Sequence, residues 1–310
     1  MSNFMTYLQN VSAQTRFLIG IVLLVIANMC FSTKAVIIKL MYQFHVDTFS
    51  VIALRMLFSL PVYVVVAIVL TNRKDNVPLT KKELLSVGGL GILSYYISSM
   101  LYFLGLQYIS AGVERLILFT YPTMVLVIAA VLFKKKITPP QYIAMLLTYI
   151  GVAIAFVAEK GLGDQKNLVL GASLIFTCAF TYAFFVIGTG ELAQRFGSIK
   201  FTCYAVLAAT VPALIQSYIY DGLNIFNFSP EVYTLSIWLS LIATVIPTFM
   251  IVEGIRLVGA GNSGIIGFVG PVWTIFLANW LLNEPITALQ LVGTAIVLAG
   301  VFLISWKGKN

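Results

Sequence analysis

The sequence predicts an all-α polytopic membrane protein whose ten transmembrane helices form two inverted five-helix repeats. Hydrophobic residues make up 60% of the 310 residues and charged residues only 10%, and the mean hydropathy is +0.98. A soluble domain has about 45–50% apolar and about 25% charged residues, so much of this apolar surface must face lipid. The composition therefore argues against a soluble enzyme and against a nucleic-acid-binding protein.

Ten apolar runs are each long enough to cross a bilayer as a helix, which takes about 20 residues. The first run is too long for the hydrophobic part of a signal peptide, so we expect it to remain as an uncleaved first helix. The short connecting segments leave no room for a domain outside the membrane. In chain order, the predicted spans are 17–40, 49–70, 84–107, 112–133, 139–158, 168–190, 200–220, 233–256, 261–282 and 286–306.

The distribution of Lys and Arg between the predicted spans indicates the orientation of the chain. Thirteen of these residues lie in the termini and in alternate loops, whereas the other loops hold only Lys160 and Lys166. Because basic loops stay in the cytoplasm, we expect both termini to be cytoplasmic in a multi-pass protein of the bacterial inner membrane. The net charge of +8 is then a topology signal and implies no nucleic-acid partner.

The two halves of the chain, residues 1–160 and 161–310, match each other in register. Gly, Pro and Gln positions agree over four helices, which chance similarity between apolar segments does not readily produce. Each half holds five spans, and an odd number turns the second copy upside down in the membrane; inverted repeats of this kind typify secondary transporters. The offset is 149 residues for Gly105 with Gly254 and Pro122 with Pro271, and 151 residues for Gly20 with Gly171 and Pro61 with Pro212.

Five stretches of the chain resemble the EamA-type family of the drug/metabolite transporter superfamily. They are 31–39, 53–58, 105–122 with 137–138, 270–271 and 283–287. The resemblance implies two copies of a five-span unit and a transport activity, in a family that handles amino acids, other metabolites and cations. Lys134–Lys136 departs from it by replacing an acidic residue that the second copy keeps as Glu284, which we expect in a loop.

The charged residues inside predicted spans or at their ends include Lys34, Arg55, Glu114 and Arg115. A charge inside a span costs about 2.5–3.5 kcal/mol on insertion scales. Two interpretations of these charged residues stay open. They could snorkel to the interface and form a structural ion pair, or they could contact a substrate or a proton. Our hypothesis is that Glu114 pairs with Arg55 or Lys34 and holds an outer gate. Lys39 is interpreted as an interface anchor.

Polar and aromatic side chains recur at helical spacing on several spans, as at Asn28 with Ser32 and at Tyr95 with Ser99. Such stripes either join helices or line a polar cavity. We expect no catalytic residue and no metal site, because His45 has no partner ligands nearby in sequence. The candidate substrate-binding residues are Asn28, Ser32, Lys34, Tyr95, Ser99, Tyr102, Glu114, Tyr121, Thr177 and Trp273, and Lys34, Arg55, Glu114 and Arg115 are the candidate gate or ion-pair residues.

These features predict a secondary active or facilitative transporter of small polar metabolites, with amino-acid or related export preferred, that works by alternating access. A Walker sequence is absent, so ATP is not expected to drive it, and protons are a candidate coupling ion. The expected partners are a small-molecule substrate and the lipid bilayer, with no cofactor. The alternatives are an intramembrane lipid-modifying enzyme, for which His45 and Asp47 form the only close pair, and a channel.

Overall fold

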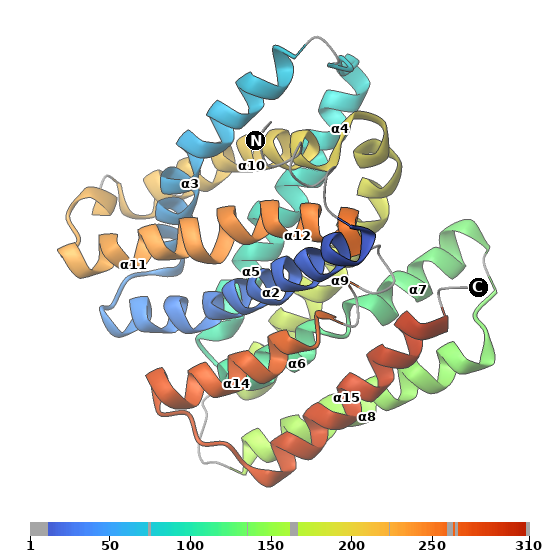
Figure 1. Ribbon diagram of the computed structural model, residues 1–310. Coiled ribbons are helices and arrows are strands. Elements are labelled where there is room, and N and C mark those ends of the chain that lie inside the picture. The colour runs from blue at the N-terminus through green and yellow to red at the C-terminus, as the bar shows by residue number, and fades with distance from the viewer. Residues whose placement is uncertain are drawn as a thin grey trace.

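The computed structural model describes residues 12–73, 76–134, 136–161, 167–222, 224–258, 263 and 266–307, and all regular structure in these residues is helical. Figure 1 shows these helices packed against one another as a bundle. The elements are α2 (Ala13–Gln43), α3 (Thr48–Thr71), α4 (Lys81–Gly91), η1 (Ile92–Ser98), α5 (Ser99–Leu106), α6 (Ala111–Leu118), α7 (Tyr121–Phe133), α8 (Pro139–Lys160), α9 (Leu168–Phe196), α10 (Ser198–Asp221), η2 (Asn224–Phe226), α11 (Pro230–Ser240), η3 (Leu241–Val245), α12 (Ile246–Val258), α14 (Val269–Leu282) and α15 (Ala288–Lys307).

Eight helical stretches of the described chain are long and apolar enough to cross a membrane. They cover the first eight predicted spans, and the third and eighth stretches each combine two α-helices with a π-helical segment. The ninth and tenth predicted spans coincide with shorter apolar helices, Val269–Leu282 and Ala288–Leu303. Residues 259–262 and 264–265, where the ninth predicted span begins, lie outside the described residues.

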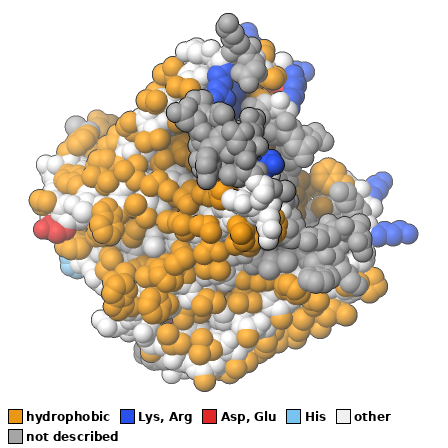
Figure 2. All heavy atoms as spheres, in the orientation of Figure 1, with side chains coloured by type: hydrophobic (Ala, Val, Ile, Leu, Met, Phe, Trp, Pro, Cys, Tyr) orange, Lys and Arg blue, Asp and Glu red, His pale blue; other side chains and the backbone are white. Residues whose placement is uncertain are grey.

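The surface of the bundle has the composition expected of a lipid-facing protein. Hydrophobic side chains cover most of the face seen in Figure 2, with Lys and Arg gathered towards one end of the molecule. Large apolar side chains such as Leu85, Val131 and Ile219 are between 73% and 79% exposed. Patches of this extent are not tolerated in water by a soluble monomer, so the structure is that of a multi-pass membrane protein.

Side-chain caps explain where several helices begin. Asp47 accepts hydrogen bonds from the backbone N–H groups of Phe49 and Ser50, at 2.8 and 3.0 Å, and so starts α3. Thr80 with Glu83 forms a capping box at α4, and the Thr138 N–H donates to Gln141 at the start of α8. Each cap satisfies N–H groups that a helix leaves without intrahelical partners.

The third and eighth helical stretches contain π-helical segments at equivalent positions of the two halves. Residue 92, where η1 begins, and residue 241, where η3 begins, are separated by the 149-residue offset found in the sequence. Lys134 and Asn283 are related by the same offset, and both end their helices at φ 53°. The duplication therefore extends to irregular backbone as well as to apolar composition.

Two helix crossings repeat this equivalence in three dimensions. Where α2 crosses α12, a Cβ atom at Gly20 would lie 2.4 Å from Val258 Cγ2, and a Cβ at Gly254 would lie 2.6 Å from Leu24 Cγ. Only glycine permits such an approach of two backbones. The two helices lie side by side in Figure 1.

The crossing of α5 with α9 has the same construction. A Cβ at Gly171 would lie 2.7 Å from Ile109 Cγ2, and a Cβ at Gly105 would lie 2.6 Å from Ile175 Cδ1. Each of these four residues is the equivalent of one in the first crossing, because Gly20 and Leu24 lie 151 residues before Gly171 and Ile175, and Gly105 and Ile109 lie 149 residues before Gly254 and Val258.

The helices α8 and α15 occupy equivalent positions in the two halves, and they pack directly against each other. A Cβ at Gly151 would lie 2.7 Å from the Gly293 carbonyl oxygen, and a Cβ at Gly300 would lie 2.7 Å from that of Ala144. Gly151 and Ala144 lie 149 residues before Gly300 and Gly293. Figure 1 shows the two helices packed along their length at one edge of the bundle.

Candidate substrate site

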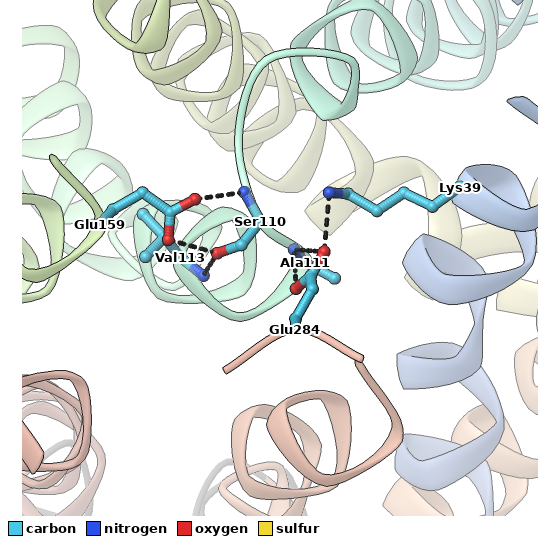
Figure 3. A network of polar contacts seen from close by, with 6 residues as sticks. All are labelled: Lys39, Ser110, Ala111, Val113, Glu159 and Glu284. Atoms are coloured by element: carbon cyan, nitrogen blue, oxygen red, sulfur yellow. Dashed lines mark hydrogen bonds and ion pairs between the residues drawn. The ribbon is translucent and has the colours of Figure 1, made fainter. Parts of the chain in front are cut away.

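Two carboxylates from other parts of the chain hold the N-terminus of α6 (Figure 3). Glu159, at the end of α8, accepts hydrogen bonds from the Ser110 N–H at 2.7 Å and the Ser110 hydroxyl at 2.6 Å. Glu284 accepts from the Ala111 N–H at 2.9 Å. A helix N-terminus carries partial positive charge and unpaired N–H groups, so both carboxylates are well placed there.

Glu284 also forms an ion pair with Lys39, with 2.7 Å between Lys39 Nζ and Glu284 Oε1. This pair joins α2 of the first half to the segment between α14 and α15 of the second half. We call Lys39, Ser110, Ala111, Glu159 and Glu284 the α6 cap network. Lys39 therefore has a specific partner, in contrast to the plain interface anchor expected from the sequence.

A pocket of about 490 Å³ lies beside the α6 cap network, at the C-terminal end of α2. Lys39 and Glu284 form part of its wall together with Tyr42, Gln107 and His45. The lipid-modifying enzyme considered from the sequence would need His45 and Asp47 to act together. Asp47 instead caps the start of α3 through its Oδ1 atom.

Arg55 is 3% exposed and interacts with the π-helical segment η1. Its Nη2 donates to the Tyr95 carbonyl oxygen and to Ser99 Oγ, each at 3.0 Å. A π-helical turn disturbs the regular hydrogen-bond ladder, and Arg55 supplies a donor to a carbonyl in that turn. The structure thus gives Arg55 a helix-stabilising position that could not be deduced from its location in a predicted span.

Lys34 lies against aromatic faces of α5. Its Nζ is 4.2 Å from the centroid of the Tyr102 ring and 5.7 Å from that of Phe103. The Arg55 guanidinium carbon lies 5.1 Å from the same Phe103 ring. The two cations therefore share an aromatic neighbour, and cation–π contacts of this kind attract each of them to the ring.

Glu114 and Arg115 lie deep in the bundle at the first turn of α6. Glu114 is fully buried, and the Tyr102 hydroxyl is the side-chain hydrogen-bonding group next to its carboxylate. Arg115 and Lys34 are its principal cationic neighbours. Arg115 lies against α14, where a Cβ at Gly270 would be 2.7 Å from Arg115 Nη2. We call Lys34, Glu114 and Arg115 the charged cluster.

The hypothesis of a direct ion pair between Glu114 and Arg55 or Lys34 is not borne out in this conformation. Within the described part of the chain, the ion pairs within 4.0 Å are Lys39–Glu284, Glu83–Arg195 and Glu253–Arg256. Glu253 and Arg256 pair across one helical turn of α12.

The other candidate residues are divided between the vicinity of the charged cluster and sites elsewhere. Ser32 is buried, and its hydroxyl lies 3.1 Å from a Cβ built at Gly270, beside Arg115. Trp273 has a buried indole N–H without a partner among the described residues, one turn beyond Gly270 on α14. Thr177 is exposed and donates to the Ser173 carbonyl oxygen of its own helix. The remaining candidates make contacts within or between helices: Asn28 donates to the Leu24 carbonyl oxygen, Tyr95 packs on Phe185, Ser99 accepts from Arg55, Tyr102 lies under Lys34, and Tyr121 packs on Tyr182.

Comparison with known proteins identifies the family. The model of the EamA-like transporter family matches residues 18–157 and again 169–306, so the chain belongs to this family. The protein is thus a membrane transporter, and the family expected from the sequence is confirmed.

Two relatives and one solved structure illustrate the range of similarity. The uncharacterized transporter YcbK of Bacillus subtilis (strain 168) is 28% identical over 92% of this chain and 91% of its own length. A probable terminal-alkyne amino-acid exporter of Streptantibioticus cattleyicolor is 26% identical over 65% of this chain and 66% of its own. A solved crystal structure superposes with a TM-score of 0.64 at 15% identity, covering 96% of this chain and all of that one, which shows a shared fold.

Proposed function

We propose that the protein is a secondary transporter that exports amino acids or related small polar metabolites by alternating access. The observation that carries this proposal is the pair of equivalent glycine crossings. Gly20 and Lys39 are separated by 19 residues of α2, about 28 Å at 1.5 Å per residue. Lys39 reaches Ala111 through Glu284, and Gly105 lies one short turn before Ala111, so the two crossings occupy opposite ends of the bundle.

Equivalent contacts at opposite ends are what two inverted repeats require. If each half holds five spans, giving ten in all, a movement that opens one crossing has an energetically similar counterpart at the other end. A site between the ends would then become accessible from alternate sides. The two matches to the family model, one for each half, support this arrangement.

The proposed substrate site is the charged cluster with its polar and aromatic neighbours. Its contacts with Ser32, Tyr102 and α14 place it between helices of both halves. Coupling to protons would suit a buried carboxylate such as Glu114. The name of the Streptantibioticus relative supports export of an amino-acid-like compound.

The proposed orientation has both termini in the cytoplasm of a bacterial inner membrane. Single cysteines at Lys136 and Glu231, in a chain without its three native cysteines, test this orientation in intact cells. An impermeant thiol reagent should label the cysteine at 231 and spare the one at 136, because the basic loop is expected inside. Labelling at 136 alone would reverse the orientation.

Transport itself is tested with purified protein in liposomes loaded with a mixture of radiolabelled amino acids and organic acids. We expect efflux of a subset of these solutes to exceed that from protein-free liposomes and to saturate with concentration. A protein reconstituted after Gly151→Leu replacement, which forces a side chain into the α8–α15 interface, provides a disrupted control. Equal efflux from protein-free, wild-type and disrupted samples would contradict the proposal.

A further inference from the structure

Charge inside the bundle is strongly unbalanced. Three cations, Lys34, Arg55 and Arg115, and one carboxylate, Glu114, lie together among the described helices α2, α3, α5 and α6. The equivalent positions of the second half are Phe185, Val206, Ser263 and Gly264, so that half supplies no compensating acid. The interior therefore carries an excess of two positive charges when all four groups are ionised, and uncompensated charge at membrane depth is costly.

Among the described residues, Arg55 is the one of these three cations that donates hydrogen bonds to protein oxygens. Its Nη2 donates to the Tyr95 carbonyl oxygen and Ser99 Oγ. The Arg115 guanidinium has five N–H groups. Its neighbours among the described residues include the Phe119 ring, whose centroid is 5.5 Å from Cζ, Gly270 of α14, where a Cβ would lie 2.7 Å from Nη2, and the Glu114 carboxylate. Arg115 Nε is buried without an acceptor among the described residues.

Lys34 Nζ likewise lies over aromatic rings, and no oxygen in the described part of the chain accepts a hydrogen bond from it. It belongs to the same electrostatic cluster as Arg115 and Glu114. Two cations with uncommitted donors therefore lie near one carboxylate. Arg55 also has a buried Nε without an acceptor among the described residues, but its Nη2 is paired with protein oxygens. The half-buried side chains of Lys34 and Arg115 have no such paired donor in the described part of the chain, which leaves their donors available to a ligand.

We propose that the site takes a small organic acid of net negative charge, whose carboxylate is bound by Arg115 and Lys34. A planar guanidinium matches a carboxylate with two parallel hydrogen bonds, and the ammonium adds a second positive charge. The rings of Tyr102 and Phe119, which lie against Lys34 and Arg115, would supply apolar contacts to the rest of the molecule. This inference rests on the proposed transport function and narrows its substrate class.

Binding to the purified full-length protein in detergent tests the charge requirement. Thermal unfolding is measured with acid and amide partners of matched shape: glutamate with glutamine, succinate with succinamide, and benzoate with benzamide. We expect the acid of at least one pair to raise the unfolding temperature in a saturable way, and its amide to have little effect. Equal shifts for acid and amide in every pair, or no shift with any acid, would overturn the inference.

Replacement of the cations separates ligand binding from structural support. Lys34→Gln lowers the local positive charge, so without ligand we expect an unfolding temperature equal to or above that of the wild type. For Lys34→Gln and for Arg115→Gln, at least ten times more acid should be needed to produce the same shift in unfolding temperature. Lys160→Gln, at an exposed position at the end of α8, is the matched control and should retain the shift.

A lower ligand-free unfolding temperature for Lys34→Gln, together with an undiminished acid-induced shift, would show that Lys34 supports the fold and would overturn its assignment to the site. The liposome measurement keeps this inference distinct from the proposed function. Efflux of neutral solutes with exclusion of every acid would overturn the inference and leave transport standing. Acid binding without efflux of any solute would support the site and contradict transport.

Discussion

Glu114→Gln should reduce transport about a hundredfold or more while the protein remains in the membrane. The substitution preserves the shape of the side chain but removes the fully buried carboxylate of the charged cluster. Removing one member of a buried charged group costs about 3–5 kcal/mol because the others are left uncompensated, and 1.4 kcal/mol corresponds to about a factor of ten. Efflux from liposomes at matched protein density measures the loss.

The control for this prediction is Glu253→Gln, which alters a carboxylate in an exposed pair with Arg256. Exposed pairs contribute about 0–1 kcal/mol, so we expect nearly unchanged transport. A double-mutant cycle then identifies the partners of Glu114. Coupling is expected with Arg115→Gln, and little coupling with Arg55→Gln, because Arg55 donates to Tyr95 and Ser99. The reverse pattern would restore the ion pair suggested by the sequence.

Gly105→Leu and Gly254→Leu should each arrest transport, and they should do so with opposite ends of the bundle open. Each replacement forces a side chain into a crossing where even a Cβ would lie about 2.6 Å from a neighbouring carbon. Overpacking costs about 1–3 kcal/mol, enough to shift a two-state equilibrium roughly 5–150-fold. The milder variants Gly105→Ala and Gly254→Ala provide the same comparison if a leucine prevents folding.

Thiol accessibility distinguishes the two arrested states. Cysteines at the equivalent positions Tyr108 and Leu257, whose Cβ atoms face Gly171 and Gly20, report on the two crossings. We expect the cysteine at 108 to react faster in Gly105→Leu and the one at 257 to react faster in Gly254→Leu. Gly89→Leu introduces a side chain where no heavy atom lies within 4 Å of a Cβ, and should change neither rate. Faster reaction at one and the same end in both leucine variants would contradict alternating access.

Most helices could be predicted from the sequence because a span requires a long apolar run, and such runs are a local property. The breaks and π-helical segments within these helical stretches are harder to predict from the sequence. The α6–α7 break consists of Phe119 and Thr120. In the segment η1, the Tyr95 carbonyl accepts a hydrogen bond from Arg55 of another helix. Contacts between helices contribute to these irregularities, and a hydropathy profile does not contain such contacts.

The site was predicted only in part for the same reason. Lys34, Glu114 and Arg115 stand out as charges in apolar runs, and the structure brings them together. Lys39 and Glu284 are 245 residues apart, so their pairing depends on how the halves pack. Helical spacing grouped Thr177 with the polar stripes, yet it faces outward on α9; spacing identifies a shared face but does not say where that face points.

Distances between spin labels at the two ends test the account most directly. One pair joins Gln107 to Val169 across the α5–α9 crossing, and the equivalent pair joins Arg256 to Leu18 across the α2–α12 crossing; all four positions are exposed. In membranes, we expect two populations for each pair, such that conditions which lengthen one distance shorten the other. A single distance at both ends under all conditions, or lengthening of both together, would contradict a transporter that opens its two ends in turn.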